Sequence, residues 1–566
     1  MGKRFTSGLC LAVGMTALMT GGSAIAEGAG SYLAARHANI VSDFTEASRY
    51  YAKAMASAPE NVTLLDAAII AHICKGDVAG AAKLAARLEA VGHSNAIVDL
   101  VTMAADMAEG SFERAITREI AEEGLSPLMD GLIRGWAFLG EGRMSDAVAA
   151  FEEVAEISDF ATFAYYHEAL ALALVGDFET AEEIMSGAKY GPLSISTRGV
   201  EAHAQILIQL ERVADATALI DATLQRGFNA ELAALRSRID SGEDIAFDFV
   251  TSARQGTAEV LFNMAAILNG RISPNTVLIY ARLAQHLRPD HVPALVIIAQ
   301  VLEELGQYEL ATQAYGEVSS DHPAFFVAEM GRADALYADD RKDAAVEVLT
   351  ALSKSHWDIS MVHAALGDML SRIRKDDEAI ATYTTALDLR ASGDQTAWPV
   401  YYARGIVHER QKNLAEMEAD FRKALELSPD QPDVLNYLGY SLVEQRVKLD
   451  EALSMIKTAV ARRPDSGYIA DSLGWVFYRL GRYEEAVEPM ERAVSLLPVD
   501  PIVNDHLGDV YWMVGRKREA EFQWKRALSF DPEEKEEVRI RRKLDVGLDV
   551  VLDQEARGET TLSAND

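Results

Sequence analysis

The sequence is poor in cysteine: Cys10 and Cys74 are its two cysteines among 566 residues. Cys10 lies in an N-terminal segment that we expect to be removed, so the mature chain can form no disulfide within itself and must be stabilised by packing. Cys74 ends an apolar stretch that begins at Ala67. That setting is typical of a small buried side chain, whereas a catalytic cysteine would need a histidine brought close to it.

Positive charge is also scarce, since 54 Lys and Arg residues stand against 87 Asp and Glu residues and give a formal net charge of −33. Such a surplus repels phosphates and therefore excludes nucleic acid as the main partner. Hydrophobic residues nevertheless make up 49% of the chain, which is too much for a disordered acidic tail. We expect a folded protein whose partner is a protein or peptide of basic or neutral character.

Beyond its first 26 residues the sequence has no uninterrupted apolar run of the roughly 20 residues that a transmembrane helix needs. The first 26 residues themselves combine a basic start, an apolar run from Leu9 to Met19, and the small residues Ala24 and Ala26. This is the pattern of a secretory signal peptide that is cleaved before Glu27. The sequence thus predicts export into a bacterial periplasm, with any association with the outer membrane made through a partner.

Signatures of catalysis are absent as well. The sequence contains no glycine-rich phosphate loop, no paired-histidine zinc helix and no nucleophile elbow, and its 12 His are scattered. Ser454 and Lys457 match a Ser-x-x-Lys spacing, but they fall on a predicted helix and are interpreted as exposed helix residues. We expect neither enzymatic activity, nor a cofactor, nor a metal site.

What the sequence does contain is internal repetition, which is clearest in its last third. Three kinds of residue recur there at spacings of 34 or 35: a Leu-Gly pair, an alanine and a proline. They are Leu438-Gly439, Leu473-Gly474 and Leu507-Gly508; Ala452, Ala486 and Ala520; and Pro464, Pro498 and Pro532. A period of 34 residues indicates a unit of two helices joined by a turn.

Each residue type has a physical role in such a unit. The glycine and the alanine let the two helices approach closely, while large side chains such as Phe421, Tyr483 and Trp524 fill the remaining space. Gly481 and Gly515 fall at the turn between the paired helices, where a left-handed conformation is needed. The proline ends the second helix because it cannot continue the hydrogen-bond ladder.

The same register extends upstream, so that the whole chain holds about thirteen units. It weakens from Gly227 to Thr257, where Asp240 to Asp244 is polar and turn-like, and this stretch is either a degenerate repeat or a joint. Glu533 to Leu552 is predicted to form one more helix, which caps the array. The predicted organisation is a signal peptide at 1–26, an N-terminal array at 27–226, the degenerate repeat or joint at 227–257, a C-terminal array at 258–532, and the capping helix with a polar tail at 533–566.

These motifs resemble the tetratricopeptide repeat family over nearly all of the mature chain. The resemblance implies an all-α solenoid of helix-turn-helix units in a right-handed superhelix, with partners bound on the concave face that the first helix of each unit lines. The segments Asn436–Tyr440, Asp471–Trp475 and Asn504–Asp509 are similar to a group of exported bacterial repeat proteins. That group includes an outer-membrane lipoprotein adaptor, which delivers cell-wall hydrolases to a periplasmic carboxyl-terminal processing protease.

The resemblance implies an exported scaffold or adaptor that mediates protein contacts in the bacterial cell envelope and presents substrates to a periplasmic protease. A second hypothesis stays open, in which the chain is a structural component of an envelope secretion or polysaccharide-export complex. A transient complex with a protease would favour the first hypothesis, and a stoichiometric membrane complex would favour the second.

Helix geometry indicates which side chains of the last three units face the concave surface, because residues three or four positions apart share a helix face. These are Asn436, Tyr440, Asp471, Trp475, Tyr478, Arg479, Asp505, Asp509 and Trp512, with Glu444 and Met513 beside them. Aromatic rings among carboxylates suit an extended peptide with apolar and basic side chains. The alternative is that Trp475 and Trp512 pack between neighbouring units while the acids keep the surface soluble.

Overall fold

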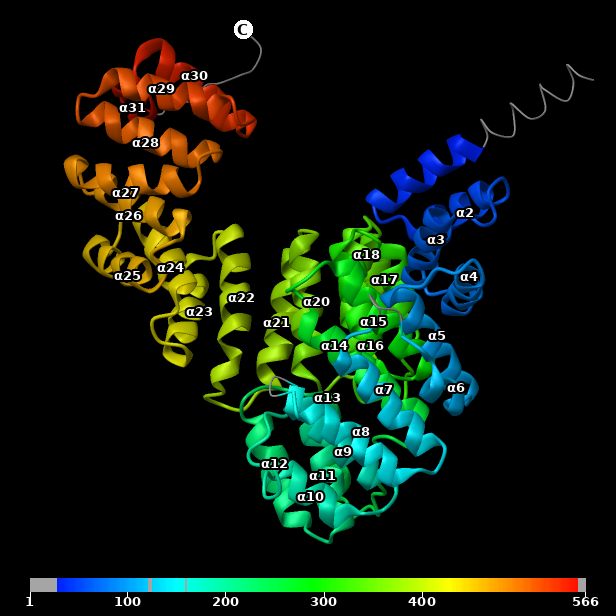
Figure 1. Cartoon of the computed structure of the whole chain (residues 1–566). Coiled ribbons are helices and arrows are strands. Elements are labelled where there is room, and N and C mark those ends of the chain that lie inside the picture. Colours follow the sequence, from blue (N-terminus) through cyan, green and yellow to red (C-terminus); the bar gives the residue numbers. More distant parts are fainter. Residues whose placement is uncertain (1–27, 121–124, 158–159, 558–566) are drawn as a thin grey trace, which may run out of the picture. The chain divides into compact units, whose positions relative to one another are not determined.

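The computed structural model describes residues 28–120, 125–157 and 160–557, and within these ranges the regular structure is helical and contains no β-strand (Figure 1). The predicted signal peptide at 1–26 lies outside the described residues. Most of the consecutive helices are joined by short turns, and the chain divides into two compact units, Met1–Leu352 and Ser353–Asp566.

The first unit begins with a helix over residues 28–40, and its last helix, α19, runs past the division by one turn. Its further helices are α2 (Phe44–Met55), α3 (Val62–Cys74), α4 (Val78–Ala90), α5 (Ala96–Glu109), α6 (Phe112–Thr117), α7 (Pro127–Gly140), α8 (Met144–Ala155), α9 (Ala161–Leu174), α10 (Phe178–Met185), α11 (Thr197–Gln209), α12 (Val213–Leu224), α13 (Ala230–Asp240), α14 (Ala253–Leu268), α15 (Pro274–Leu287), α16 (Val292–Glu304), α17 (Tyr308–Gly316), α18 (Phe325–Ala338) and α19 (Lys342–Ser355).

The second unit continues the alternation to the C-terminus. Its elements are α20 (Ser360–Arg372), α21 (Asp376–Asp388), the short helix η2 (Gln395–Ala397), α22 (Trp398–Arg410), α23 (Leu414–Leu427), α24 (Pro432–Glu444), α25 (Leu449–Arg462), α26 (Gly467–Arg479), α27 (Tyr483–Leu496), α28 (Pro501–Met513), α29 (Lys517–Leu528), α30 (Glu534–Val546) and α31 (Leu548–Ala556). In the described ranges α3 to α12 make five pairs and α14 to α29 make eight, and the helix at 28–40 pairs with α2 in addition. The all-α repeat architecture predicted from the 34-residue period is confirmed.

The pair α26 and α27 shows how the sequence sets the ends of each helix. The Ser466 side chain accepts the backbone N–H of Ile469 and so caps the start of α26. Gly481 then takes a φ of +72°, the left-handed turn that glycine adopts most easily, and α27 begins at Tyr483. Pro498 follows the end of α27. The predicted turn and stop signals are confirmed in this unit.

The glycines of the Leu-Gly pairs lie where the first helix touches the second. A Cβ built on Gly474 would lie 2.5 Å from Cγ of Met490, and one on Gly508 would lie 2.4 Å from Nε1 of Trp524. Such distances are too short for any side chain, so the helices of these pairs can pack this closely because glycine stands at the contact.

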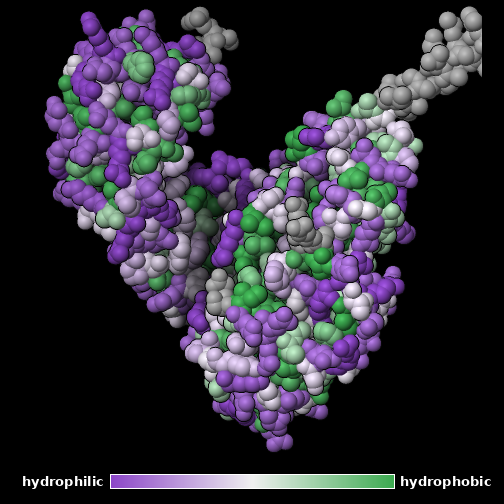
Figure 2. Space-filling view, in the orientation of Figure 1, coloured by the Kyte–Doolittle hydropathy of each residue, from purple (hydrophilic) through white to green (hydrophobic). Residues whose placement is uncertain are grey.

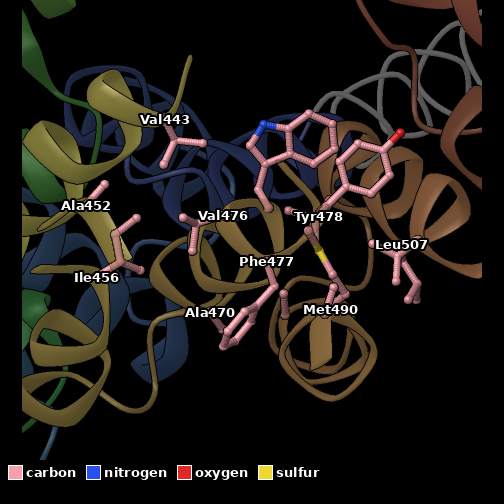
Figure 3. Packing of buried hydrophobic residues seen from close by; sticks show 14 of the residues in the cluster. Val443, Ala452, Ile456, Ala470, Val476, Phe477, Tyr478, Met490 and Leu507 are labelled. Atoms are coloured by element: carbon pink, nitrogen blue, oxygen red, sulfur yellow. The ribbon is translucent and has the colours of Figure 1, made fainter. Parts of the chain in front are cut away.

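Buried apolar side chains from successive helices form the core of the second unit. Figure 3 shows five of them, Val443 on α24, Ile456 on α25, Val476 on α26, Met490 on α27 and Leu507 on α28. All five are at most 1% exposed. Burial of each such side chain contributes about 1.5 to 3 kcal/mol, so the stability of this unit is spread along the repeats.

In the first unit the chain returns onto its earlier repeats after the segment that the sequence marks as irregular. α13 packs on α12 and α11, but no helix follows directly to pair with it, because residues 241–252 are not helical. α14 then packs against α7, where a Cβ on Gly256 would lie 2.2 Å from the Trp136 ring, and α15 packs against α3 and α5. These contacts explain why 227–257 lies inside one compact unit and why the division falls near Leu352, whereas the predicted organisation treats 258–532 as one array.

A buried ionic cluster holds this return in place. Glu259 on α14 accepts hydrogen bonds from Arg198 on α11 at 3.0 Å and from the phenol of Tyr166 on α9 at 3.2 Å, and it lies 3.2 Å from Nε2 of His291. Burial opposes ionisation of Glu259, but Arg198 and His291 outweigh it and hold the pKa of this carboxyl well below its ordinary value. Burial lowers the pKa of His291 to about 4.

The C-terminus corrects one predicted element. Glu533 to Leu552 does not form a single capping helix, because α30 ends at Val546 and α31 begins at Leu548. Gly547 between them has a φ of +86° and a ψ of 156°, a conformation that breaks an α-helix and is open essentially to glycine alone. The array therefore ends in two short helices.

The outer surface of the C-terminal helices is mainly hydrophilic. On the face drawn in Figure 2, hydrophilic residues predominate over the C-terminal helices, with hydrophobic residues dispersed among them. In the described ranges no helix combines the length and the apolar character needed to cross a membrane.

Cys74 is fully buried, and burial raises the pKa of its thiol to about 12, so it is an inert core residue as predicted.

Candidate functional site

A cavity of about 380 Å³ opens on the second unit, and its walls come from the first helices of successive pairs, α24, α26, α28 and α30. Pro501, Ile502 and Pro532 give it an apolar edge, and α31 contributes Glu555. Because first helices line it, the cavity lies on the side of the array where the resemblance implies that partners bind.

The structure brings four of the nine predicted concave-face residues to this cavity: Tyr440, Trp475, Arg479 and Asp505. The other predicted residues lie outside its lining. They are Asn436, Asp471, Tyr478, Asp509 and Trp512. The nine predicted residues lie on more than one face of each helix. Those on the faces beside the cavity pack against the neighbouring helix instead.

Trp475 forms a three-ring stack at the cavity wall. Its ring lies 4.7 Å from the ring of Tyr478 and 4.0 Å from the imidazole of His506, with interplanar angles of 8° and 15°. Its Nε1–H donates to Glu444 at 2.7 Å, and Arg479 donates to the same oxygen at 2.9 Å. With 8% of its surface exposed, Trp475 is mainly a packing residue that shows one edge to the cavity.

Asp505 and Asp509 have their charge compensated inside the protein. Lys543 of α30 donates to both carboxylate oxygens of Asp505 at 2.8 and 2.7 Å and to Asp509 at 2.6 Å, and its side chain is fully buried. Trp524 donates its indole N–H to Asp509 at 3.0 Å, and the Arg539 guanidinium lies within 3.7 Å of both acids. The expectation that these carboxylates attract a basic peptide is corrected, because α30 supplies their counter-charges.

Asp471 is likewise engaged within the chain. Its carboxylate lies 3.0 Å from Nδ1 of His506 on the next first helix. Burial alone would lower the pKa of His506, but the carboxylates of Asp471, Asp505 and Asp509 outweigh it and raise that pKa above its ordinary value. The imidazolium form is thus favoured, as an ion pair with Asp471 and stacked on Trp475.

The remaining predicted residues, Trp512, Tyr478 and Asn436, are partly or fully buried within the protein. Trp512 is half-buried, its ring lies 5.3 Å from that of Trp524, and its indole N–H donates to Asp549 of α31 at 2.9 Å. Tyr478 is buried, and burial raises its pKa well above the ordinary value. The side-chain oxygen of Asn436 is buried and accepts no hydrogen bond from the described residues.

Several residues of the cavity wall were not predicted from the sequence, and α30 supplies most of them. Lys535, Glu536 and Arg539 of α30, with Glu555 of α31 and His506, complete the wall. Lys535 and Arg539, together with Lys543, recur every four residues, a spacing that places basic side chains on one helix face. This spacing is visible in the sequence, but the apolar residues of the same segment predict only a capping helix.

The cavity combines an apolar edge with open polar groups. Arg479 makes one hydrogen bond and Lys535 makes none within the described residues, so N–H groups remain open beside an Ile502 side chain that is 51% exposed. In the described ranges no set of three or more His, Cys, Asp or Glu residues is placed to hold a metal ion. An apolar edge with convergent polar groups is the usual composition of a recognition site.

Comparison with known proteins identifies the repeats. Three tetratricopeptide repeat models match residues 362–395, 399–431 and 438–501. A TPR repeat-containing protein of Pseudomonas aeruginosa is 31% identical over 128 residues, which are 20% of this chain and 22% of that protein. Human tetratricopeptide repeat protein 13 is 26% identical over 185 residues, 32% of this chain and 21% of that protein. The chain thus spans about a fifth of the length of these relatives.

Two solved structures are also similar. YrrB, described as a TPR protein with an unusual peptide-binding site, is 20% identical with a TM-score of 0.28, and the match covers 35% of this chain and 99% of that one. The APC/C hetero-tetramer Cut9-Hcn1 gives 14% identity and a TM-score of 0.39, over 92% of this chain and 96% of that one.

The paired helices and the cavity on their first-helix side define a helical-repeat scaffold that mediates protein-protein contacts. No catalytic family is indicated by the matches. The repeats of this chain belong to the tetratricopeptide repeat family, with family models matching between residues 362 and 501.

Proposed function

We propose that this protein is an exported scaffold of the bacterial cell envelope that holds a segment of a partner protein in the cavity of its second unit. In this proposal it acts as an adaptor that presents substrates to a periplasmic protease. The observation that carries the proposal is the cavity among α24, α26, α28 and α30, where exposed Ile502 stands beside the open N–H groups of Arg479 and Lys535.

Two features of the sequence support the cellular setting. The pattern of residues 1–26 is that of a secretory signal peptide, and a net charge of −33 disfavours nucleic acid as a partner. The expectation of a basic or neutral partner came from the acidic net charge and from Asp471, Asp505 and Asp509. The internal pairing of these three acids removes the second basis at the cavity.

The binding role is tested by affinity capture from a bacterial envelope extract with the mature protein as bait. Ile502→Asp places a charge on the cavity edge at an exposed position, and Val499→Asp is the matched control, because Val499 is 66% exposed and does not line the cavity. We expect a processing protease or a cell-wall hydrolase to be enriched by the wild type and by Val499→Asp and lost with Ile502→Asp. Equal recovery on an unrelated helical solenoid would contradict the proposal.

Export is tested separately. Expression of the full chain in a Gram-negative host, followed by fractionation and N-terminal sequencing, should give a periplasmic protein that begins at Glu27. A cytoplasmic protein with an intact N-terminus would refute export. Recovery in a stoichiometric membrane complex on native gels would favour the structural-component hypothesis instead.

A further inference from the structure

The last helix of the chain, α31, occupies the side of the array that the cavity opens on. The residues that line the cavity come from first helices, except Pro532 in the connection before α30 and Glu555 of α31. No other second helix of a pair contributes to the described lining. α31 therefore lies on the surface formed by first helices.

The contacts of α31 are those of a bound ligand helix. Leu548 is fully buried in the core of the second unit, Leu552 packs against that core, and Val551 is 3% exposed. Asp549 accepts the indole N–H of Trp512 at 2.9 Å, and Glu555 accepts a hydrogen bond from Arg539 at 2.8 Å.

The charges on the two sides of this contact are complementary. α31 supplies acceptors at Asp549, Gln554 and Glu555, and the surface beneath supplies donors from Trp512, Arg539 and Arg542. Lys517 adds a positive charge 3.9 Å from Asp549. The surface beneath α31 thus selects an acidic amphipathic helix with apolar residues at positions i and i+3.

The connection between α30 and α31 allows this helix to leave as a unit. Gly547 is the single residue between the two helices, and its φ of +86° and ψ of 156° mark a break in the helical hydrogen-bond ladder. The outward side of α31 is exposed, including Val550 at 41%. A nine-residue helix held by three apolar side chains and by exposed polar contacts is among the less stable parts of such a chain.

We propose that α31 is an internal stand-in for a partner, and that the surface formed by Trp512, Lys517, Arg539 and Arg542 binds an acidic amphipathic helix of the partner protein when α31 is displaced. This inference rests on the proposed scaffold function and names the chemistry of its partner. While α31 is docked it competes at high effective concentration, which weakens the apparent affinity for the partner helix.

The test uses the full mature chain and a fluorescent peptide with the sequence of residues 548–557. Leu548→Ala/Val551→Ala truncates the two most buried of the three apolar side chains that hold α31 and leaves the surface beneath it unchanged. We expect the peptide to bind this variant at least about tenfold more tightly than it binds the wild type, because the internal competitor is weakened. A peptide with Asp549→Lys and Glu555→Lys is the matched control and should lose binding to the variant.

A second variant, Asp549→Ala/Glu555→Ala, loosens α31 without removing apolar contacts and covers the case in which the first variant misfolds; circular dichroism checks the fold of both variants.

Hydrogen exchange on the wild type gives an independent readout, in which the amides of α31 should exchange faster than those of α28. Equal peptide affinity for wild type and both variants, or protection of α31 equal to that of α28, overturns the proposal. A variant that forms dimers which the peptide dissociates would assign the surface to a second copy and also overturn it. These measurements need no envelope partner, so their failure is distinguishable from failure of the capture experiment.

Discussion

At the scale of single residues, the charges of the second unit are arranged around Lys543. Its ammonium group is fully buried and satisfies two carboxylates, Asp505 and Asp509, that are themselves buried. Buried ion pairs of this kind add little to the free energy of unfolding when they are compared with apolar residues in place of all the charged ones. Loss of one member alone leaves an uncompensated charge in the interior.

Lys543→Met should therefore lower the free energy of unfolding by about 3 to 5 kcal/mol, since both acids lose their nearest cation. Urea denaturation followed by circular dichroism measures the effect. Lys525→Met is the control, because Lys525 is 65% exposed and its nearest acid, Glu521, lies 3.7 Å away; its change should stay within about 0.5 kcal/mol. A loss for Lys543→Met as small as that of the control would contradict the buried pairing.

His506 should make this unit sensitive to pH. Its pKa is raised above the ordinary value by Asp471, Asp505 and Asp509, so the folded state holds its proton more tightly than the unfolded state, whose imidazole titrates near pH 6.5. Protonated His506 therefore stabilises the folded state fully below about pH 6.5. This stabilisation is lost as the pH rises through the pKa that His506 has in the folded protein.

The stability difference between wild type and His506→Gln should accordingly be larger near pH 6 than near pH 9. Denaturation curves at both pH values measure it, and His93→Gln, at an exposed position, is the control that should show no such change. A difference that grows towards high pH would show that His506 is neutral in the folded protein.

At the scale of the helix, the glycine of each Leu-Gly pair sets how closely the two helices of a unit approach. The side chain that faces the glycine differs between the pairs: Ile456 lies opposite Gly439, Met490 opposite Gly474 and Trp524 opposite Gly508. The contact therefore combines no side chain on one helix with a large side chain on the other.

Gly508→Ala should destabilise the protein by about 1 to 3 kcal/mol, because the new methyl group would meet the Trp524 ring at 2.4 Å. Gly316→Ala is a control with the opposite sign, since Gly316 ends α17 with no atom within 4 Å of its Cβ position, and a gain of a few tenths of a kcal/mol to about 1 is expected. Thermal melting of both variants measures the effects. Equal effects at the two positions would argue against the close packing of α28 on α29.

At the scale of the whole molecule, the chain divides after Leu352 into two compact units. In the first unit, α14 and α15 return onto α3, α5, α7 and α9, so sequence-distant repeats share one core. In the second, each repeat packs on its neighbours in order. Two separate cores favour two unfolding events rather than one.

Calorimetry of the mature chain should show two transitions, and a fragment of residues 353–566 should melt with one of them, because its core is complete within the unit. Lys543→Met in the full chain should shift that same transition and leave the other in place. A fragment without cooperative melting, or a shift of both transitions, would show that the units depend on each other.

The sequence by itself determined the repeat architecture, because spacing, helix caps and turn glycines act within about 34 residues, as in the unit that runs from Ser466 to Pro498. It also predicted that Tyr440, Trp475, Arg479 and Asp505 share one side of the array, and these four line the cavity, since helix periodicity is local. The tertiary structure decided what the periodicity does not encode. It alone paired Lys543 with Asp505 and Asp509 across 38 and 34 residues, returned α14 onto α7, and seated α31 beside the cavity. The physical reason is that these contacts join residues far apart in the chain, and their energy depends on burial and on a partner's charge, which a repeat pattern does not specify.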